Sequence, residues 1–280
     1  MNTNNFKIEN LIANKHIIDC HTHTHHSMDS ELSFEDLLSG ARERNVKIIT
    51  ITDHSDLFPT SSKEDIDGAI ASLQETEKVS KQTNDILILK GIEIGGLCHN
   101  RKIADEILKS SYDFILGSIH NIRNTEDFYF MDFNNKQLDI HEKLNLYFQE
   151  CLELVLTEKI DSLAHLTYPI RYINGNYKKN INLDCHKNII DEILNSLIKL
   201  EISLEVNTGG VRKPIGEISP EYDILQRYYN FGGKLLTIGS DAHYKEHVGL
   251  DELECMIKLK NIGFKELTYY INRKKYFATL

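Results

Sequence analysis

The sequence predicts a single-domain (β/α) barrel with seven parallel strands, and three observations predict it. The chain has 280 residues, no low-complexity linker divides residues 1–280, and one barrel of about 250 residues forms a complete domain. Short β-branched runs alternate with longer stretches of helical spacing, which is the pattern of parallel strands joined by right-handed crossovers. Each short run also ends in a polar residue, and the strand ends of such a barrel carry its active face.

The expected strands are the short apolar runs, and the expected helices are the longer segments that follow them. The strands are Ile17–His23, Lys47–His54, Ile86–Gly95, Phe114–His120, Asp161–Leu166, Ile202–Gly210 and Lys234–His243. The helices are Ser33–Asn45, Lys63–Gln82, Arg101–Ser110, Asp139–Lys159, Cys185–Leu200, Pro220–Phe231 and Leu250–Asn261. Ser33 begins the first helix as an N-cap, with Asp36 three residues later in an arrangement close to a capping box. An open doubly wound sheet is the alternative, but it requires a glycine-rich phosphate loop after the first strand, where this chain has HTHTHH.

The composition is that of an ordinary globular protein, with 41% hydrophobic and 26% charged residues. Lys plus Arg number 32 and Asp plus Glu number 42, so the net charge is −10, which disfavours nucleic acid and anionic membranes as partners. No stretch approaches the roughly 18 apolar residues of a membrane-spanning helix, and the first residues lack a secretory signal pattern. The five cysteines are scattered and odd in number, as expected of reduced thiols in a cytoplasmic protein.

Every predicted strand ends in a side chain that can bind a metal ion or a polar substrate. In chain order these residues are His21 and His23, His54, Glu93, His120, His165, Asn207, and Asp241 with His243. A single histidine in such a position is more often a hydrogen-bonded loop residue than a ligand. Seven strand ends in register are improbable as independent coincidences, so the pattern predicts one shared site on the C-terminal face of the barrel.

The spacing of these residues indicates a metal site. His21 and His23 stand two residues apart, so both imidazoles lie on one face of a strand, and Asp241 and His243 repeat that spacing. Glu93 has two carboxylate oxygens and can bridge two ions. A mixed set of histidine and carboxylate ligands suits Zn, Mn or Fe.

The motifs resemble those of the PHP (polymerase and histidinol phosphatase) superfamily. The matching segments are HTHTHHSMDS, ITDHSD, GIEIG, FILGSIH, AHL, EVNTGGVRK and GSDAH, and the likeness runs from about Ile17 to Val248. More narrowly, the chain looks like the monofunctional histidinol-phosphatases of histidine biosynthesis. The resemblance implies a distorted seven-stranded, TIM-barrel-like fold and two or three divalent metal ions.

The resemblance also implies which residues bind each ion. The first ion would be bound by His21, His23, Glu93 and Asp241, and the second by Glu93, His120 and His165. The third would be bound by Asp29, His54 and His243. Asp29 stands eight residues after His21, where other branches carry histidine, and Thr167 stands where relatives often carry aspartate. His25 and His26 match no fixed ligand of the family, so we expect both to lie outside the metal site.

The implied activity is hydrolysis of the small phosphate ester L-histidinol phosphate to L-histidinol and phosphate, by attack of a metal-bridging hydroxide. The candidate catalytic residues are Glu93, Asp241 and His243. Arg171 follows the His165 strand end by six residues, and Arg212 follows Asn207 by five. A planar guanidinium pairs with two phosphate oxygens, so we expect both arginines to bind substrate, with Asn207 as a third candidate.

Two alternatives remain open. The same chemistry could act on a nucleotide, a nucleoside bisphosphate or another small phosphomonoester, since a net charge of −10 disfavours only a polymeric substrate. A non-catalytic metal- or phosphate-binding regulator on a decayed barrel would be expected to have lost a ligand, and all nine positions are filled. The sequence does not predict the oligomeric state.

Overall fold

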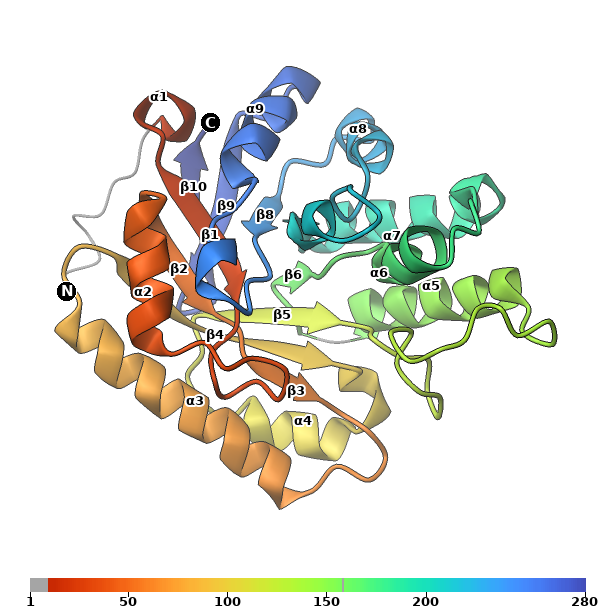
Figure 1. Cartoon of the computed structure of the whole chain (residues 1–280), viewed down its shortest axis with the longest axis horizontal. Coiled ribbons are helices and arrows are strands. Elements are labelled where there is room, and N and C mark those ends of the chain that lie inside the picture. The colour runs from red at the N-terminus through yellow and green to blue at the C-terminus, as the bar shows by residue number, and fades with distance from the viewer. Residues whose placement is uncertain (1–9, 158) are drawn as a thin grey trace.

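The computed structural model describes residues 10–157 and 159–280 and has seven parallel strands at its centre (Figure 1). They are β1 (Ile17–Thr22), β2 (Val46–Ile51), β4 (Leu87–Gly95), β5 (Phe114–Ser118), β6 (Ser162–Leu163), β7 (Ser203–Asn207) and β8 (Leu236–Gly239). Neighbours in this order pair in parallel, which confirms the predicted fold class. A further short strand, β3 (His54–Asp56), pairs in parallel with β4.

The ring of strands is joined where the segment after β8 meets β1. The Asp241 amide donates to the His21 carbonyl oxygen at 2.8 Å, and the His23 amide donates to the Ala242 carbonyl oxygen at 3.0 Å. Thr22 and Ala242 form a parallel bridge at the same place. The two motifs with alternating ligand-type residues are therefore held side by side at the C-terminal ends of their strands.

Helices surround the strands (Figure 1). The longer ones are α2 (Phe34–Glu43), α3 (Lys63–Gln82), α4 (Arg101–Ile107), α5 (Ile140–Thr157), α7 (Lys187–Leu200), α8 (Tyr222–Asn230) and α9 (Glu252–Ile262), whereas α1 (Leu11–Asn14) and α6 (Tyr168–Ile170) are very short. Ser33 Oγ accepts a hydrogen bond from the Asp36 amide at 3.1 Å, so the predicted N-cap is present. Among the described residues, no helix has the length and apolar character needed to cross a membrane.

The predicted strand Lys47–His54 is divided into β2 and β3. The division falls at Asp53, whose buried carboxylate accepts hydrogen bonds from Thr24, Ser27 and Ser72. These bonds anchor the backbone at this point, so the chain leaves its pairing with β1 and continues beside the C-terminal half of β4. The division places His54, the first residue of β3, at the C-terminal end of the barrel.

An antiparallel hairpin follows α9, where no strand was expected. Its strands are β9 (Glu266–Ile271) and β10 (Lys274–Thr279). The Tyr270 hydroxyl donates to the Asp161 carbonyl oxygen at 2.9 Å, and the Asn272 amide donates to Asp113 Oδ1 at 2.8 Å. Because Asp113 and Asp161 come immediately before β5 and β6, the hairpin covers the end of the barrel opposite the expected site.

Candidate metal centre and active site

The nine side chains expected to bind metal meet at the C-terminal ends of the strands. They are His21, His23, Asp29, His54, Glu93, His120, His165, Asp241 and His243. Each has a nitrogen or oxygen atom within 3.4 Å of such an atom in another member. The structure therefore brings the whole expected set into one continuous cluster.

Glu93 lies at the centre of this cluster and is fully buried. Its Oε2 atom lies 3.1 Å from His21 Nε2 and 3.1 Å from His54 Nδ1. Its Oε1 atom lies 3.0 Å from His165 Nε2 and 3.2 Å from His120 Nε2. Because the two oxygens of one carboxylate face two separate pairs of imidazoles, Glu93 has the geometry of a bridge between two ion positions.

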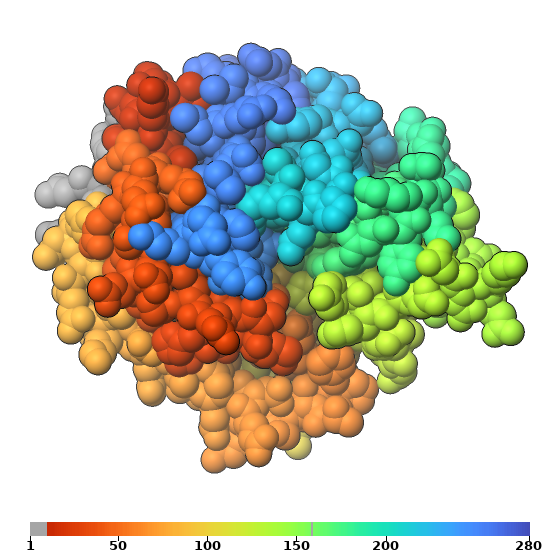
Figure 2. Space-filling view, viewed as in Figure 1, coloured from red at the N-terminus to blue at the C-terminus, as the bar shows by residue number. Residues whose placement is uncertain are grey.

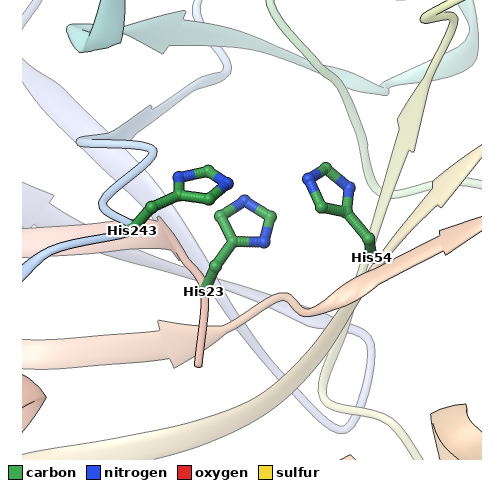
Figure 3. A group of neighbouring side chains, drawn as sticks. All are labelled: His23, His54 and His243. Carbon is green, nitrogen blue, oxygen red and sulfur yellow. The ribbon is translucent and has the colours of Figure 1, made fainter. Parts of the chain in front are cut away.

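The imidazoles of His23, His54 and His243 lie together at one side of the cluster (Figure 3). The ring of His23 stacks against the ring of His54 and against the ring of His243, with centroid separations of 4.2 Å in both cases. The Asp29 carboxylate reaches the same place, 3.0 Å from His243 Nε2 and 3.7 Å from His54 Nε2. Asp29 therefore stands where the resemblance expects the third ion position, with a carboxylate in place of histidine.

Ring nitrogens at the centre of the cluster lie close to one another. His21 Nδ1 lies 2.6 Å from Glu205 Oε1, a contact that would leave Nε2 of a neutral ring free to bind a metal ion. That Nε2 atom lies 3.0 Å from His23 Nε2, and the Nε2 atoms of His120 and His165 are 3.3 Å apart. Two nitrogens bound to one tetrahedral zinc also stand about 3.3 Å apart, as Zn–N bonds of about 2.0–2.1 Å require. The donor set therefore fits divalent metal ions.

Charges within the cluster shift its pKa values strongly. Burial raises the pKa of the Glu93 and Asp241 carboxyl groups, but the facing histidines outweigh burial and hold both pKa values well below the usual range. Burial and the neighbouring imidazoles lower the pKa of His23 to about 3. Against the lowering effect of burial, Glu93 raises the pKa of His54 to about 9. Both carboxylates are thus ionised at neutral pH and available to cations.

Two ligand-type residues adopt backbone conformations that L-residues rarely adopt. Asp241 has φ of 56° and His165 has φ of 21°. Such positions cost about 1–3 kcal/mol each and persist where surrounding contacts hold them. The His165 amide donates to Glu205 Oε2 at 2.7 Å, and the Asp241 amide donates to the His21 carbonyl oxygen at 2.8 Å. These bonds hold both side chains toward the cluster.

Two acidic residues that were not among the expected site residues contact the histidines. Glu205 is buried and contacts His21 Nδ1, and Asp56 Oδ1 lies 2.8 Å from His120 Nδ1. Carboxylates in this position fix the tautomer of a metal-binding histidine. The sequence does contain an indication for Glu205. It is a charged residue in the middle of an apolar strand, and it stands two positions before Asn207, so both side chains point to the same face of the strand.

The two arginines expected to bind substrate differ in their surroundings. Arg171 is buried and donates from Nη1 to Asp241 Oδ2 at 3.1 Å and from Nη2 to Asn207 Oδ1 at 2.7 Å. Arg212 donates from Nη2 to the Ser240 carbonyl oxygen at 2.7 Å, and its buried Nε and Nη1 atoms have no hydrogen-bond partner among the described residues. Arg212 thus offers two donors to an anion, whereas Arg171 and Asn207 already orient Asp241 and each other.

His25 and His26 lie outside the cluster, as expected. Both face Glu75, whose Oε2 atom is 3.5 Å from His25 Nε2 and 2.9 Å from His26 Nε2. Thr167 instead contacts Ser219, with 2.9 Å between the two hydroxyl oxygens.

The fold and the cluster define a (β/α) barrel with a group of metal-ligand side chains at its C-terminal face. The PHP domain family model matches residues 19–209, and the chain belongs to this family. The probable histidinol-phosphatase of Clostridium acetobutylicum is 32% identical over 267 residues, which cover 93% of this chain and 99% of that protein. The probable histidinol-phosphatase of Thermotoga maritima is 29% identical over 251 residues, covering 90% of this chain and 94% of that protein.

A solved structure is similar over nearly the whole chain. It is the histidinol phosphate phosphatase from Lactococcus lactis subsp. lactis Il1403, complexed with zinc, L-histidinol and phosphate. The TM-score is 0.78 at 28% sequence identity, and the match covers 92% of this chain and 98% of that one.

Proposed function

We propose that this chain is a metal-dependent histidinol-phosphatase, which hydrolyses L-histidinol phosphate to L-histidinol and phosphate in histidine biosynthesis. The observation that carries the proposal is Glu93, whose two oxygens face two separate histidine pairs at the active end of the barrel. The similarity to histidinol-phosphatases over nine-tenths of the chain supports the choice of substrate. The proposal assigns residues 1–280 to one catalytic domain.

The proposal includes two or three divalent ions, of Zn, Mn or Fe. The first would be held by His21, His23, Glu93 and Asp241, the second by Glu93, His120 and His165, and the third by Asp29, His54 and His243. When bound, the ions would supply positive charge to the phosphate and a nucleophile at neutral pH. We also propose that the enzyme acts in the cytoplasm, because all five cysteines are free thiols.

The chain's own residues would bind and orient the reacting groups. Arg212 would donate to a phosphate oxygen from Nε or Nη1, because these buried donors have no other partner among the described residues. Arg171 and Asn207 would keep the Asp241 carboxylate turned toward the cluster. Asp241 is ionised at neutral pH and suits the role of proton acceptor from the attacking water, and His243 at the rim is the candidate donor to the leaving alkoxide.

A substrate panel tests the proposal. Phosphate release is measured from L-histidinol phosphate, AMP and a nucleoside 3′,5′-bisphosphate with enzyme purified without chelator. We expect kcat/KM for L-histidinol phosphate to exceed the others by at least about a hundredfold, because a site that hydrogen-bonds its substrate's polar groups rejects analogues lacking them. A preference for either nucleotide would overturn the assigned substrate.

The number of ions is tested separately by elemental analysis of the same preparation. We expect more than one transition-metal ion per chain, because nine ligand-type side chains are too many for one tetrahedral ion. A reproducible content of one ion or fewer would contradict the polynuclear site.

A further inference from the structure

A second group of metal-ligand side chains lies outside the candidate active site. His141 is in the first turn of α5, and Cys185 and His186 are in the 3-10 helix Leu183–His186 that precedes α7. One ligand atom from each of the three lies within 4.8 Å of the other two. The helices α5 and α7 pack against each other at the periphery of the barrel, and neither contributes a side chain to the central cluster (Figures 1 and 2).

The distances between these atoms match a tetrahedral metal site. His141 Nδ1 lies 3.2 Å from His186 Nε2 and 3.3 Å from Cys185 Sγ. With Zn–N bonds of about 2.0–2.1 Å and a Zn–S bond of about 2.3 Å, tetrahedral angles place two nitrogens about 3.3 Å apart and a nitrogen and a sulfur about 3.6 Å apart. Both separations are within about 0.3 Å of these values, and the third, between the Cys185 sulfur and a ring nitrogen of His186, is below 4.8 Å. Movements of about 1 Å or less would therefore let the three side chains share one ion.

Hydrogen bonds satisfy this group in part, because Cys185 Sγ donates to the Asn182 carbonyl oxygen at 3.7 Å, but His141 Nδ1 has two polar neighbours. His141 Nδ1 carries either one proton or one lone pair, yet it faces both the Cys185 sulfur and the His186 nitrogen. One proton cannot be donated fully to two acceptors, and one lone pair cannot accept fully from two donors. An ion that draws a lone pair from each of the three atoms satisfies all of them at once.

The surroundings of the group favour an ion that can enter from solvent. His186 is buried, and its ring packs against Phe148 and lies nearly parallel to the ring of His141, which fixes its direction. His141 and Cys185 are exposed, which leaves the fourth position open to water.

We infer that His141, Cys185 and His186 form a further metal site, which binds one Zn²⁺ ion through two nitrogens and one thiolate with a water as the fourth ligand. Binding displaces the proton of the Cys185 thiol, because the thiolate is the ligand. The ion would join the start of α5 to the start of α7. This inference does not depend on the proposed reaction, because none of the three residues contacts the central cluster.

Cobalt substitution tests the inference without reference to activity. The nine residues of the candidate active site include no cysteine, so a thiolate-to-Co²⁺ charge-transfer band in the near ultraviolet reports only on the peripheral site. We expect this band in the Co²⁺-loaded full-length protein, its loss in Cys185→Ser, and its retention in Lys187→Ala, a matched change at the next exposed position. A band that persists in Cys185→Ser, or no band in the unsubstituted protein, would overturn the inference.

Thiol reactivity gives a second, independent measurement. Cys185 is exposed whereas the other four cysteines are buried, so alkylation of the folded protein reports on Cys185. We expect micromolar Zn²⁺ to slow its alkylation by at least about tenfold, and the double change His141→Ala with His186→Ala to abolish this protection. Protection that appears only near about 1 mM Zn²⁺, equivalent to about 4 kcal/mol of binding, would mean an adventitious ion only and would also reject the site.

Discussion

Replacing Glu205 with glutamine tests whether a buried carboxylate orients the metal-binding histidines. Glu205 is almost fully buried, and its two oxygens contact different partners. Oε1 lies 2.6 Å from His21 Nδ1, and Oε2 accepts from the His165 amide at 2.7 Å. Glutamine preserves the volume of the side chain but replaces one acceptor oxygen with an NH₂ group. One of the two N–H donors must then face another donor.

The expected loss follows from these two contacts. Removing a carboxylate that orients a metal-binding histidine typically lowers metal affinity or activity about 10- to 100-fold, or about 1.4–2.7 kcal/mol. The N–H left without an acceptor adds a cost of about 1–3 kcal/mol to folding, whether it belongs to His21 or to His165. We therefore expect Glu205→Gln to bind metal about 10- to 100-fold more weakly and to unfold at a lower temperature.

Metal affinity is measured by competition with a chromophoric chelator, and kcat/KM is measured for L-histidinol phosphate. Glu201→Gln is the matched control, because Glu201 is exposed and contacts only Lys275 in the described structure. Thermal unfolding of both variants without metal separates a loss of folding from a loss of orientation. Wild-type metal affinity in a folded Glu205→Gln protein would refute the role assigned to this carboxylate.

Three further changes have expected outcomes. Glu93→Gln should lower kcat/KM by at least about a hundredfold in a protein that still folds, because a direct bridging ligand should matter more than an outer carboxylate, whose loss costs about 10- to 100-fold. Wild-type turnover with full metal content would contradict the bridging role. Arg212→Ala should lower kcat/KM about ten- to a hundredfold for both L-histidinol phosphate and a plain aryl phosphate. Arg212→Lys should restore part of this loss, because lysine keeps the charge but not the planar donor geometry. A loss confined to L-histidinol phosphate would place Arg212 at the other end of the substrate. Burial raises the pKa of Glu221 to about 7, above the value of about 4.3 in the unfolded chain. The folded protein therefore holds this proton more tightly than the unfolded chain does. The resulting stabilisation is fully present below about pH 4 and is lost by about pH 8. The free energy of unfolding, measured by chemical denaturation, should therefore fall by about 1–3 kcal/mol more for the wild type than for Glu221→Gln between these pH values. Parallel dependence of the two free energies on pH would contradict the raised pKa of Glu221.

The ligand-type residues could be predicted from the sequence because strand geometry repeats every two residues. His21 and His23 flank one threonine, so both must point to the same side of β1, and the fold class puts that end of β1 at the active face. The same reasoning places Asp241 beside them, and the structure has Asp241 Oδ1 at 3.4 Å from His23 Nε2. These positions depend only on local spacing and on the order of the strands.

Residues that act through a neighbour could not be predicted in this way. Whether Glu205 faces His21 or an apolar side chain depends on the tilt and stagger of strands that are 184 residues apart in sequence. The contact between Arg171 and Asp241 could not be predicted either, because the two residues lie 70 positions apart in sequence. The role of Arg171 in binding substrate stays a prediction. Local spacing indicates that a side chain reaches the active face, and tertiary packing decides what it contacts there.

The hairpin formed by β9 and β10 stabilises the end of the barrel opposite the polar cluster. The Asp113 carboxylate accepts from the Asn272 amide with one oxygen and from the Lys90 amide with the other, so a single buried side chain ties the hairpin to the start of β4. Tyr270 adds a hydrogen bond to the backbone before β6 and packs its ring against Phe114. These contacts close the N-terminal end of the barrel with paired polar groups and apolar area, which favours folding. The buried charges and strained backbone at the other end oppose folding, so contacts such as those of the hairpin and the apolar core must offset them.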